Sequence, residues 1–189
     1  MLTGGRFELG IGAGLPHAAT IAAEQLGLPL LSPGERLAAV GYAIDHLRLL
    51  DGDTHTPVLV AAGGPRARAL AAEKADIVTL AAAPLTSRVE LAAMATEIRG
   101  RAGDRADDIE FSMNLFVIGE QVPPWAEQFI GADAATLIAH DSLALLCGNT
   151  QQMADELQRR RDDIGISYVC VNAAFCEQLA PVVEFLAGR

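Results

Sequence analysis

The chain of 189 residues is long enough for one globular domain with a substantial core, and its 51% hydrophobic content argues against intrinsic disorder. Aromatic residues make up only 5%, while alanine, leucine, valine and glycine are abundant, which favours helices packed on a parallel sheet over a β-sandwich. A formal net charge of −10 would repel a phosphate backbone, so we expect no nucleic-acid partner.

Cysteine usage and hydropathy set further bounds. The three cysteines form no CxxC pair and are odd in number, so neither a disulfide framework nor a zinc site is indicated. No stretch approaches the roughly 18 apolar residues of a membrane span. The N-terminus MLTGGRFELG also lacks a basic region followed by an apolar run. We therefore expect a single domain over residues 1–189 that is cytoplasmic, holds no metal and does not contact the membrane.

The first predicted strand ends in a glycine cluster. Phe7, Leu9 and Ile11 alternate with polar or small residues, and the pattern ends in the sequence GIGAG. A short alanine-rich helical stretch follows. Residues 32–35 (SPGE) then form a capping box with proline at the first helical position, which predicts a helix from about Pro33 to Leu50.

The next segments alternate between buried strands and helices. Residues 57–62 (PVLVAA) are a short apolar run of the kind that a parallel sheet buries on both faces. The sequence GGP at 63–65 opens a helix that ends near Lys74, and residues 75–80 (ADIVTL) form a third apolar run. This rhythm is that of βαβ units and predicts a parallel sheet.

The second half of the chain continues the alternation of helices and strands. A capping box at 87–90 opens a helix that Gly100 is expected to end, and a long mixed connection at 123–147 is expected to hold two short helices and an extended LALLC segment. The remaining predicted elements are a strand at 109–117, a helix from a cap at Asn149 or Thr150 to Gly165, a strand at 166–171 and a closing helix at 175–186.

Five predicted strands are too few to close a barrel of eight, so an open doubly wound sheet is the geometrical alternative. The glycine cluster does not favour a dinucleotide-binding motif. Gly10-x-Gly12 is followed by Leu15 and Gly12-x-Gly14 by His17, so GxGxxG is not met. An acidic residue that closes a second strand about 20 positions later is also absent.

Two glycine-rich strand exits, at 10–14 and 61–65, are the candidate binding elements. Glycines allow the backbone to approach a ligand closely, and amides at a helix N-terminus form an anion site. Phosphate or flavin contact is therefore plausible at both exits. The alternative is that the glycines only make tight strand-to-helix turns.

The chain resembles the luciferase-like monooxygenase superfamily, in particular its deazaflavin-dependent branch, over nearly its whole length. The segments that carry the resemblance are, in order, GRFELGIGAG, GLPLLSPGERL, PVLVAAGGPRARALAAEKADIV, CGNTQQMADELQRRRDDIGISYVCV and LAPVVEFLAGR. The resemblance implies an incomplete (β/α)8 barrel of five parallel strands, the fourth to the eighth. It also implies an oxidoreductase that moves a hydride to or from a small organic substrate with coenzyme F-420, or FMN as the alternative.

The resemblance also assigns residues to the cofactor site. It places the ring beside the first glycine exit, the cofactor tail and phosphate at the second exit, and further lining at the end of the third strand. The residues assigned in this way are Gly12, Ala13 and Gly14, then Ala61, Ala62, Gly63 and Gly64, then Thr79 and Leu80.

Three departures from the family pattern limit these assignments. The family often has a larger or polar residue after the first loop, where this chain has Leu15. The first three family strands, which hold an acidic or histidine residue and a cis peptide, are absent, so no catalytic residue is assigned. The chain also runs from Leu50 to Pro57 without the usual excursion, which predicts a more open pocket.

Four other polar features of the sequence bear on function. His17 follows the first glycine loop and is the best histidine for substrate or proton contact, with a surface or packing role as the alternative. Asn114 points opposite to the apolar set of its strand, into the barrel interior or into an interior hydrogen-bond network. The arginines at 159–161 are expected to form ion pairs on a solvated helix face. Ser142 has no GxSxG context, so hydrolysis has no support.

Two alternatives concern the chain as a whole. The first is a catalytically silent remnant or cofactor-binding module that completes its sheet by dimerisation, because exposed sheet edges favour a homodimer. The second is a misplaced start, since Met1 stands directly before a strand that the resemblance places in mid-barrel. Upstream codons would then encode three more βα units.

Overall fold

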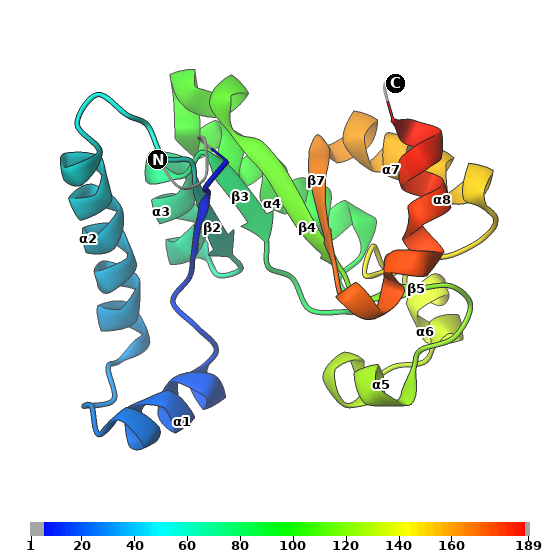
Figure 1. The fold of residues 1–189 in the computed structure, drawn as a ribbon, viewed down its shortest axis with the longest axis horizontal. Helices are drawn as coiled ribbons and strands as arrows, with labels where there is room; N and C mark the ends of the chain where they lie inside the picture. The colour runs from blue at the N-terminus through cyan, green and yellow to red at the C-terminus, as the bar shows by residue number, and fades with distance from the viewer. Residues whose placement is uncertain (1–5, 188–189) are drawn as a thin grey trace.

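A computed structural model describes residues 6–187, and its main feature is a sheet of five parallel strands in the order β1-β2-β3-β4-β7 (Figure 1). A second sheet pairs β5 with β6, also in parallel. The strands are β1 (Leu9–Ile11), β2 (Val58–Ala62), β3 (Ile77–Leu80), β4 (Glu110–Leu115), β5 (Val117–Ile118), β6 (Leu145–Leu146) and β7 (Ile166–Val171).

Eight α-helices and two short 3-10 helices connect the strands within the described residues. The helices are α1 (Pro16–Leu26), α2 (Pro33–Asp51), α3 (Pro65–Lys74), α4 (Arg88–Ala102), α5 (Pro124–Ile130), α6 (Ala134–Ala139), α7 (Thr150–Ile164) and α8 (Cys176–Leu186), with η1 (Gly103–Asp108) and η2 (Ala173–Phe175). The predicted capping boxes at Ser32 and Ser87 are confirmed, and Asn149 caps α7 in the same way.

Two predicted boundaries are wrong. Helix α4 continues past Gly100 to Ala102, because one glycine inside a helix costs only about 1 kcal/mol. The strand predicted at 109–117 ends at Leu115. Val117 belongs to the second sheet, because its amide and that of Phe116 donate to the Ala144 carbonyl at 3.1 and 2.9 Å. Alternating hydrophobicity identifies a strand but does not identify its partner.

Five of the α-helices in the described residues pack on one face of the main sheet. Helices α2, α3, α4, α7 and α8 follow one another around this face (Figure 1). Their apolar side chains and those that the strands direct outward form one core, which includes Ile44, Val60, Ala71, Val78, Ile98, Phe111, Met153 and Ile166. A doubly wound sheet has helices on both faces and a reversal of strand order, and neither occurs here. The barrel-like alternative is therefore correct.

The two outer strands of the main sheet approach each other. Five strands in a flat sheet would separate the outermost pair by about 19 Å, since neighbours lie about 4.8 Å apart. The Tyr168 hydroxyl on β7 nevertheless donates to a carboxylate oxygen of Glu8, directly before β1, at 3.3 Å. The sheet is therefore strongly curled, in the manner of a barrel that is not closed.

The concave side of the curled sheet carries its side chains in rows. Strand register aligns Ala61, Thr79, Ser112 and Tyr168 at one level, and Gly12 lies next to Ala61. Thr79 and Ser112 are buried, and the Ser112 hydroxyl has no hydrogen-bond partner within residues 6–187. The concave side is thus lined by small residues next to β1 and β2 and by polar side chains at its centre.

A buried arginine fastens α7 to the connection between β4 and β7. The Arg160 guanidinium donates to the carbonyls of Leu143 and Leu145 at 2.9 and 2.8 Å and to Glu156 at 2.7 Å. Its side chain is 2% exposed, so the predicted solvated face at 159–161 is wrong for Arg160. Consecutive helical residues point about 100° apart, so three adjacent arginines cannot share one face.

The carboxylate of Glu156 supports this arginine. Burial acts to raise the pKa of Glu156, but hydrogen bonds from Arg160 and Arg88 outweigh burial and lower the pKa to about 2, from an ordinary value of 4.5. Because the pKa is lowered in the folded state, the ionised carboxylate stabilises the fold above about pH 4.5. That contribution is lost as the pH falls toward 2.

We predict that Glu156→Gln lowers the free energy of unfolding at neutral pH by about 3–5 kcal/mol, because it leaves Arg160 buried without its carboxylate. The difference between the variant and the parent chain should shrink as the pH falls from 5 toward 2. Urea unfolding over this pH range measures both effects. Arg159→Gln is the control, since Arg159 is 61% exposed and its pair should be worth less than about 1 kcal/mol. Equal losses in the two variants would contradict the account.

Candidate functional site

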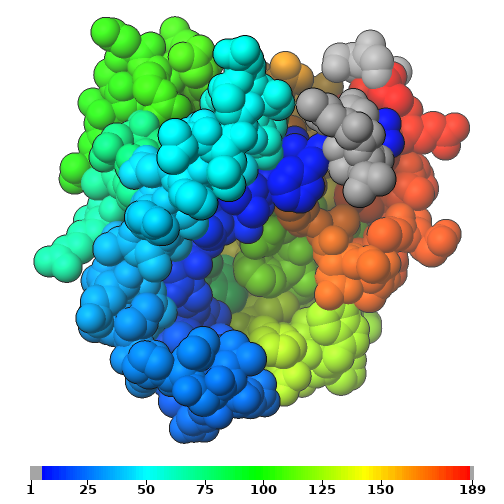
Figure 2. Space-filling view, turned by 60° about the vertical axis from the view of Figure 1, so that its left-hand side comes forward, coloured from blue at the N-terminus to red at the C-terminus, as the bar shows by residue number. Residues whose placement is uncertain are grey.

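The carboxyl ends of the main-sheet strands lie at one rim, which we call the carboxyl rim. Because β1, β2 and β3 are parallel neighbours, the residues that follow them, 12–15, 63–64 and 81–87, meet there. Figure 2 shows the concave side hollowed, with the blue β1–α1 segment on one side and orange η2–α8 and yellow-green α5 on the other. The structure thus brings together all three segments that the sequence singled out.

Two glycines at this rim have different structural roles. A Cβ on Gly63 would lie 2.5 Å from the Ala81 carbonyl oxygen, so the backbone of the β2 exit touches that of the β3 exit. A Cβ on Gly12 would lie 3.4 Å from the Cβ of Ala61, an ordinary contact. Gly63 is therefore required for packing, whereas Gly12 leaves the concave surface open beside Ala61.

Not every assigned residue can present its side chain to the rim. Ala62 and Leu80 are register partners that are 0% and 4% exposed, and both belong to the core under the helices. Only their backbones can reach a ligand on the concave side. Thr79 is on the concave side but is only 5% exposed. Gly12, Gly14, Ala61 and Gly64 are the exposed members of the set.

Two helices that begin directly after the glycine loops lack side-chain caps. Helix α1 follows Leu15 and α3 follows Gly64, and in neither does the N-cap side chain accept a hydrogen bond. By contrast, α2, α4 and α7 all begin with capping boxes. Pro16 and Pro65 have no N–H, so the amides that α1 and α3 offer to an anion are those of the next residues, beginning with His17 and Arg66.

Arginines that the sequence reasoning missed surround the second loop. Arg68 donates to the Gly63 carbonyl and pairs with Glu97 at 2.7 Å, so it fixes the loop. Arg66 lies in the first turn of α3, is exposed and has no ion-pair partner within the described residues. The first loop is held similarly, since Arg36 donates to the Ala13 carbonyl at 2.8 Å. The sequence offered a signal for these contacts, since two arginines follow the GGP segment within one helical turn.

An uncharged hollow of about 390 Å³ lies at the other side of the carboxyl rim, between the ends of β4 and β7 and helix α5. Asn114 and Phe116 line it, and both also line a small hollow of about 40 Å³ at the β3 exit. Asn114 is exposed, and its carboxamide has no hydrogen-bond partner within residues 6–187. The structure therefore favours the open interior position over an interior hydrogen-bond network.

The four histidines lie apart. His17 is exposed in the first turn of α1, next to the Gly14 loop. His46 stacks on Tyr42 with ring centroids 5.9 Å apart, and the His55 Nε2 lies 2.7 Å from Asp76. His140 follows α6. Only His17 is near the glycine exits.

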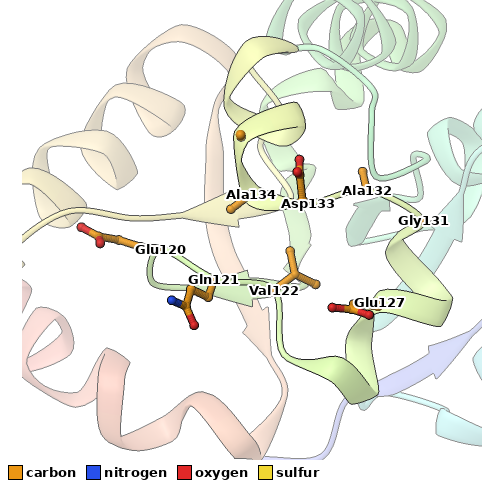
Figure 3. A pocket seen from close by; sticks show the side chains of 9 residues that line it. Glu120, Gln121, Val122, Glu127, Gly131, Ala132, Asp133 and Ala134 are labelled. Carbon is orange, nitrogen blue, oxygen red and sulfur yellow. The ribbon is translucent and has the colours of Figure 1, made fainter.

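A larger hollow of about 600 Å³ lies elsewhere, lined entirely by residues 120–135 (Figure 3). Its titratable residues are Glu120, Glu127 and Asp133, and Figure 3 shows these carboxylates spread around the hollow rather than converging. Asp133 caps α6, where its carboxylate accepts from the Thr136 amide at 2.8 Å. An acidic lining disfavours an anionic coenzyme, so this hollow is not the candidate site.

Residues 6–187 contain neither an arranged metal site nor a candidate membrane span. No group of three or more histidine, cysteine, aspartate or glutamate residues in this part of the chain is arranged to hold a metal ion. No helix in the same part is both long and apolar enough to cross a membrane.

We predict that Gly63→Ala and Gly12→Ala differ sharply in stability. The methyl group on residue 63 forces the β2 and β3 exits apart, so the free energy of unfolding should fall by about 1–3 kcal/mol. The methyl group on residue 12 meets only Ala61, so the change should stay below about 1 kcal/mol. Urea unfolding of the two variants provides the comparison. A tolerated Gly63→Ala would show that the exits do not touch as described.

Solved structures resemble the chain, whereas no family model and no curated protein matches it. An F420-dependent secondary alcohol dehydrogenase, in complex with an F420–acetone adduct, has a TM-score of 0.65 and 16% identity over 96% of this chain and 71% of its own. The coenzyme F420-dependent tetrahydromethanopterin reductase from Methanopyrus kandleri has a TM-score of 0.63 and 15% sequence identity, and the match covers 96% of this chain and 73% of the reductase. Riboflavin lyase with modified FMN and riboflavin has a TM-score of 0.60 and 12% sequence identity, and the match covers 88% of this chain and 61% of the lyase.

These similarities establish the fold. The matched region spans between 41% and 75% of the length of such structures, and sequence identities of 12–16% carry no information beyond architecture. The strand order, the curled sheet and the one-sided helix layer all agree with this architecture. The chain has the fold of an incomplete luciferase-like (β/α)8 barrel, as the sequence resemblance predicted.

Proposed function

We propose that the chain belongs to a flavin- or deazaflavin-dependent oxidoreductase, with coenzyme F-420 as the favoured cofactor and FMN as the alternative. The observation that carries the proposal is the meeting of two glycine-lined strand exits, both leading into helices without side-chain caps, at one rim of the sheet. Solved proteins of the same fold bind these two cofactors, which supports the choice.

The residues at the rim fit a flat ring with an anionic tail. Gly12 and Ala61 offer a surface without bulky side chains, on which an extended ring can lie. The amides of Gly63, Gly64 and Arg66 lie at the same rim, and the Arg66 side chain adds a cation without an ion-pair partner in residues 6–187. These groups would bind the tail and its phosphate.

When bound, such a cofactor supplies a centre that gives or accepts a hydride. The chain's own residues bind the cofactor and orient it. Arg68 and Arg36 hold the two loops in place, and α5 borders the concave side next to the ends of β4 and β7. His17 is proposed as a group that contacts the substrate or exchanges a proton, because it lies exposed beside the first loop. The substrate is a small organic molecule.

We predict that the purified chain binds coenzyme F-420 in a fluorescence titration and that Arg66→Gln raises the dissociation constant about tenfold, since it removes one charge-assisted contact. Arg161→Gln is the control, because Arg161 is an equally charged, exposed residue on α7. Affinity should also fall as salt concentration rises. Binding of FMN alone would select the alternative cofactor. No binding of either compound, or equal losses in both variants, would contradict the proposed site.

We also propose a homodimer. Within the described residues, β1 and β7 each have one unpaired edge, and the segment around α1 exposes Leu15, Leu26 and Leu28 at 76%, 69% and 59%. An exposed apolar surface of this kind favours association. Light scattering should therefore give twice the chain mass of 19.8 kDa. A stable monomer across a range of concentrations would rule out this proposal.

A further inference from the structure

The carboxyl rim is asymmetric. On the β1–β3 side the concave surface consists of small residues, Gly12, Ala61 and Ala81. On the β4–β7 side, the 390 Å³ hollow is bounded by larger side chains, and a volume of this size lies within the range of small-molecule sites. The first side is suited to an extended ring, and the second encloses space for a separate molecule.

Aromatic side chains gather around this hollow. Phe116, Trp125 and Phe129 line it while remaining 37%, 43% and 69% exposed. The Trp125 ring also rests against Phe175 at a centroid distance of 5.7 Å, which fixes its orientation. Large aromatic rings that are left partly exposed at a concave surface are suited to stacking or edge contacts with another ring. They favour a flat, aromatic ligand over a linear aliphatic one.

Two carboxamide side chains line the hollow, and that of Asn172 is engaged as the cap of η2, where it accepts from the Ala174 amide at 2.9 Å. Asn114 sits on β4, opposite Cys170 in register, and its carboxamide has no hydrogen-bond partner in residues 6–187. An amide can donate to a carbonyl oxygen, or donate to and accept from a hydroxyl. Because Asn114 also lines the small hollow at the β3 exit, an oxygen bound to it would face the cofactor side of the rim.

The absence of charge in the lining narrows the range of possible ligands further. None of the residues that line the 390 Å³ hollow is acidic or basic. A carboxylate or ammonium group would lose its hydration here without gaining a partner, at a cost of several kcal/mol. The lining is therefore complementary to an uncharged molecule.

We infer that this hollow binds the substrate, and that the substrate is an uncharged aromatic ketone or alcohol, its ring beside Trp125 and Phe129 and its oxygen on the Asn114 amide. The inference rests on the proposed function for the identity of the hollow as a substrate site. The binding contacts themselves do not depend on the cofactor.

Trp125 reports on the hollow directly, because it is the only tryptophan in the chain. Acetophenone should change its emission saturably, both with and without coenzyme F-420 present. Benzoate has a similar size but carries a charge, and it should bind at least about tenfold more weakly. Cyclohexyl methyl ketone lacks the aromatic ring and should bind about threefold to tenfold more weakly than acetophenone.

Variants identify the contacts. Asn114→Leu and Phe129→Ala should each weaken acetophenone binding about threefold to tenfold. Both side chains are exposed, so circular dichroism should confirm an unchanged fold. Tyr42→Ala is the matched control, since it removes a 71% exposed aromatic ring from α2 and should leave binding unchanged.

The outcomes separate the two proposals. Saturable acetophenone binding that the Asn114 and Phe129 variants weaken supports the inference, even if neither coenzyme binds and the proposed function fails. Coenzyme binding combined with unchanged Trp125 emission would overturn the inference and leave the proposed function standing. Equal affinity for benzoate, or equal loss in the Tyr42 variant, would also overturn it.

Discussion

The parallel, in-order pairing of the five main strands is the constraint on which the rest of the structure depends. Parallel pairing requires each strand to return through a connection, and helices α2, α3, α4, α7 and α8 lie on one face. The sheet then curls until Tyr168 meets Glu8 across its concave side. Because every strand points the same way, every strand exit lies at one rim. Loops far apart in sequence can therefore act on one ligand.

At this rim one glycine is required for backbone packing, whereas another leaves the surface accessible. Gly63 touches the Ala81 carbonyl, and Arg68 then holds the Gly63 carbonyl in place. This rigidity keeps the first amides of α3 in a fixed position, which lowers the cost of ordering them around an anion. On the opposite side, Arg160 fastens residues 143–145 to α7, and the connection that carries α5 is thereby anchored over the β4 and β7 exits. We propose one half of the rim for the cofactor and the other half for the substrate.

Much of this fold could be predicted from the sequence, because its signals are local. Apolar runs such as 57–62 and capping boxes such as Ser32–Glu35 depend on neighbouring residues, and both were confirmed. The resemblance to luciferase-like proteins was also confirmed at the level of fold. The cofactor role of Gly12–Gly14 and Ala61–Gly64 stays a prediction, although the structure places both segments at one rim.

What could not be predicted depends on contacts between distant segments. The Arg160 side chain is buried because the carbonyls of Leu143 and Leu145 accept from it, and no local pattern in RRR indicates which arginine turns inward. Val117 leaves the main sheet because of a hydrogen bond to Ala144. The Asn114 carboxamide lacks a partner because of how β4, α5 and β7 lie around it, and these elements are far apart in the sequence. The family resemblance assigned Leu80 to the site, yet its side chain lies in the core.

Amide hydrogen exchange with and without coenzyme F-420 tests the central claim most directly, because the claim concerns specific backbone amides. We expect slower exchange on binding in the peptides that cover residues 12–17 and 63–67, with little change in residues 120–135 around the acidic hollow. Protection at residues 120–135 combined with unchanged exchange at both glycine exits would contradict it.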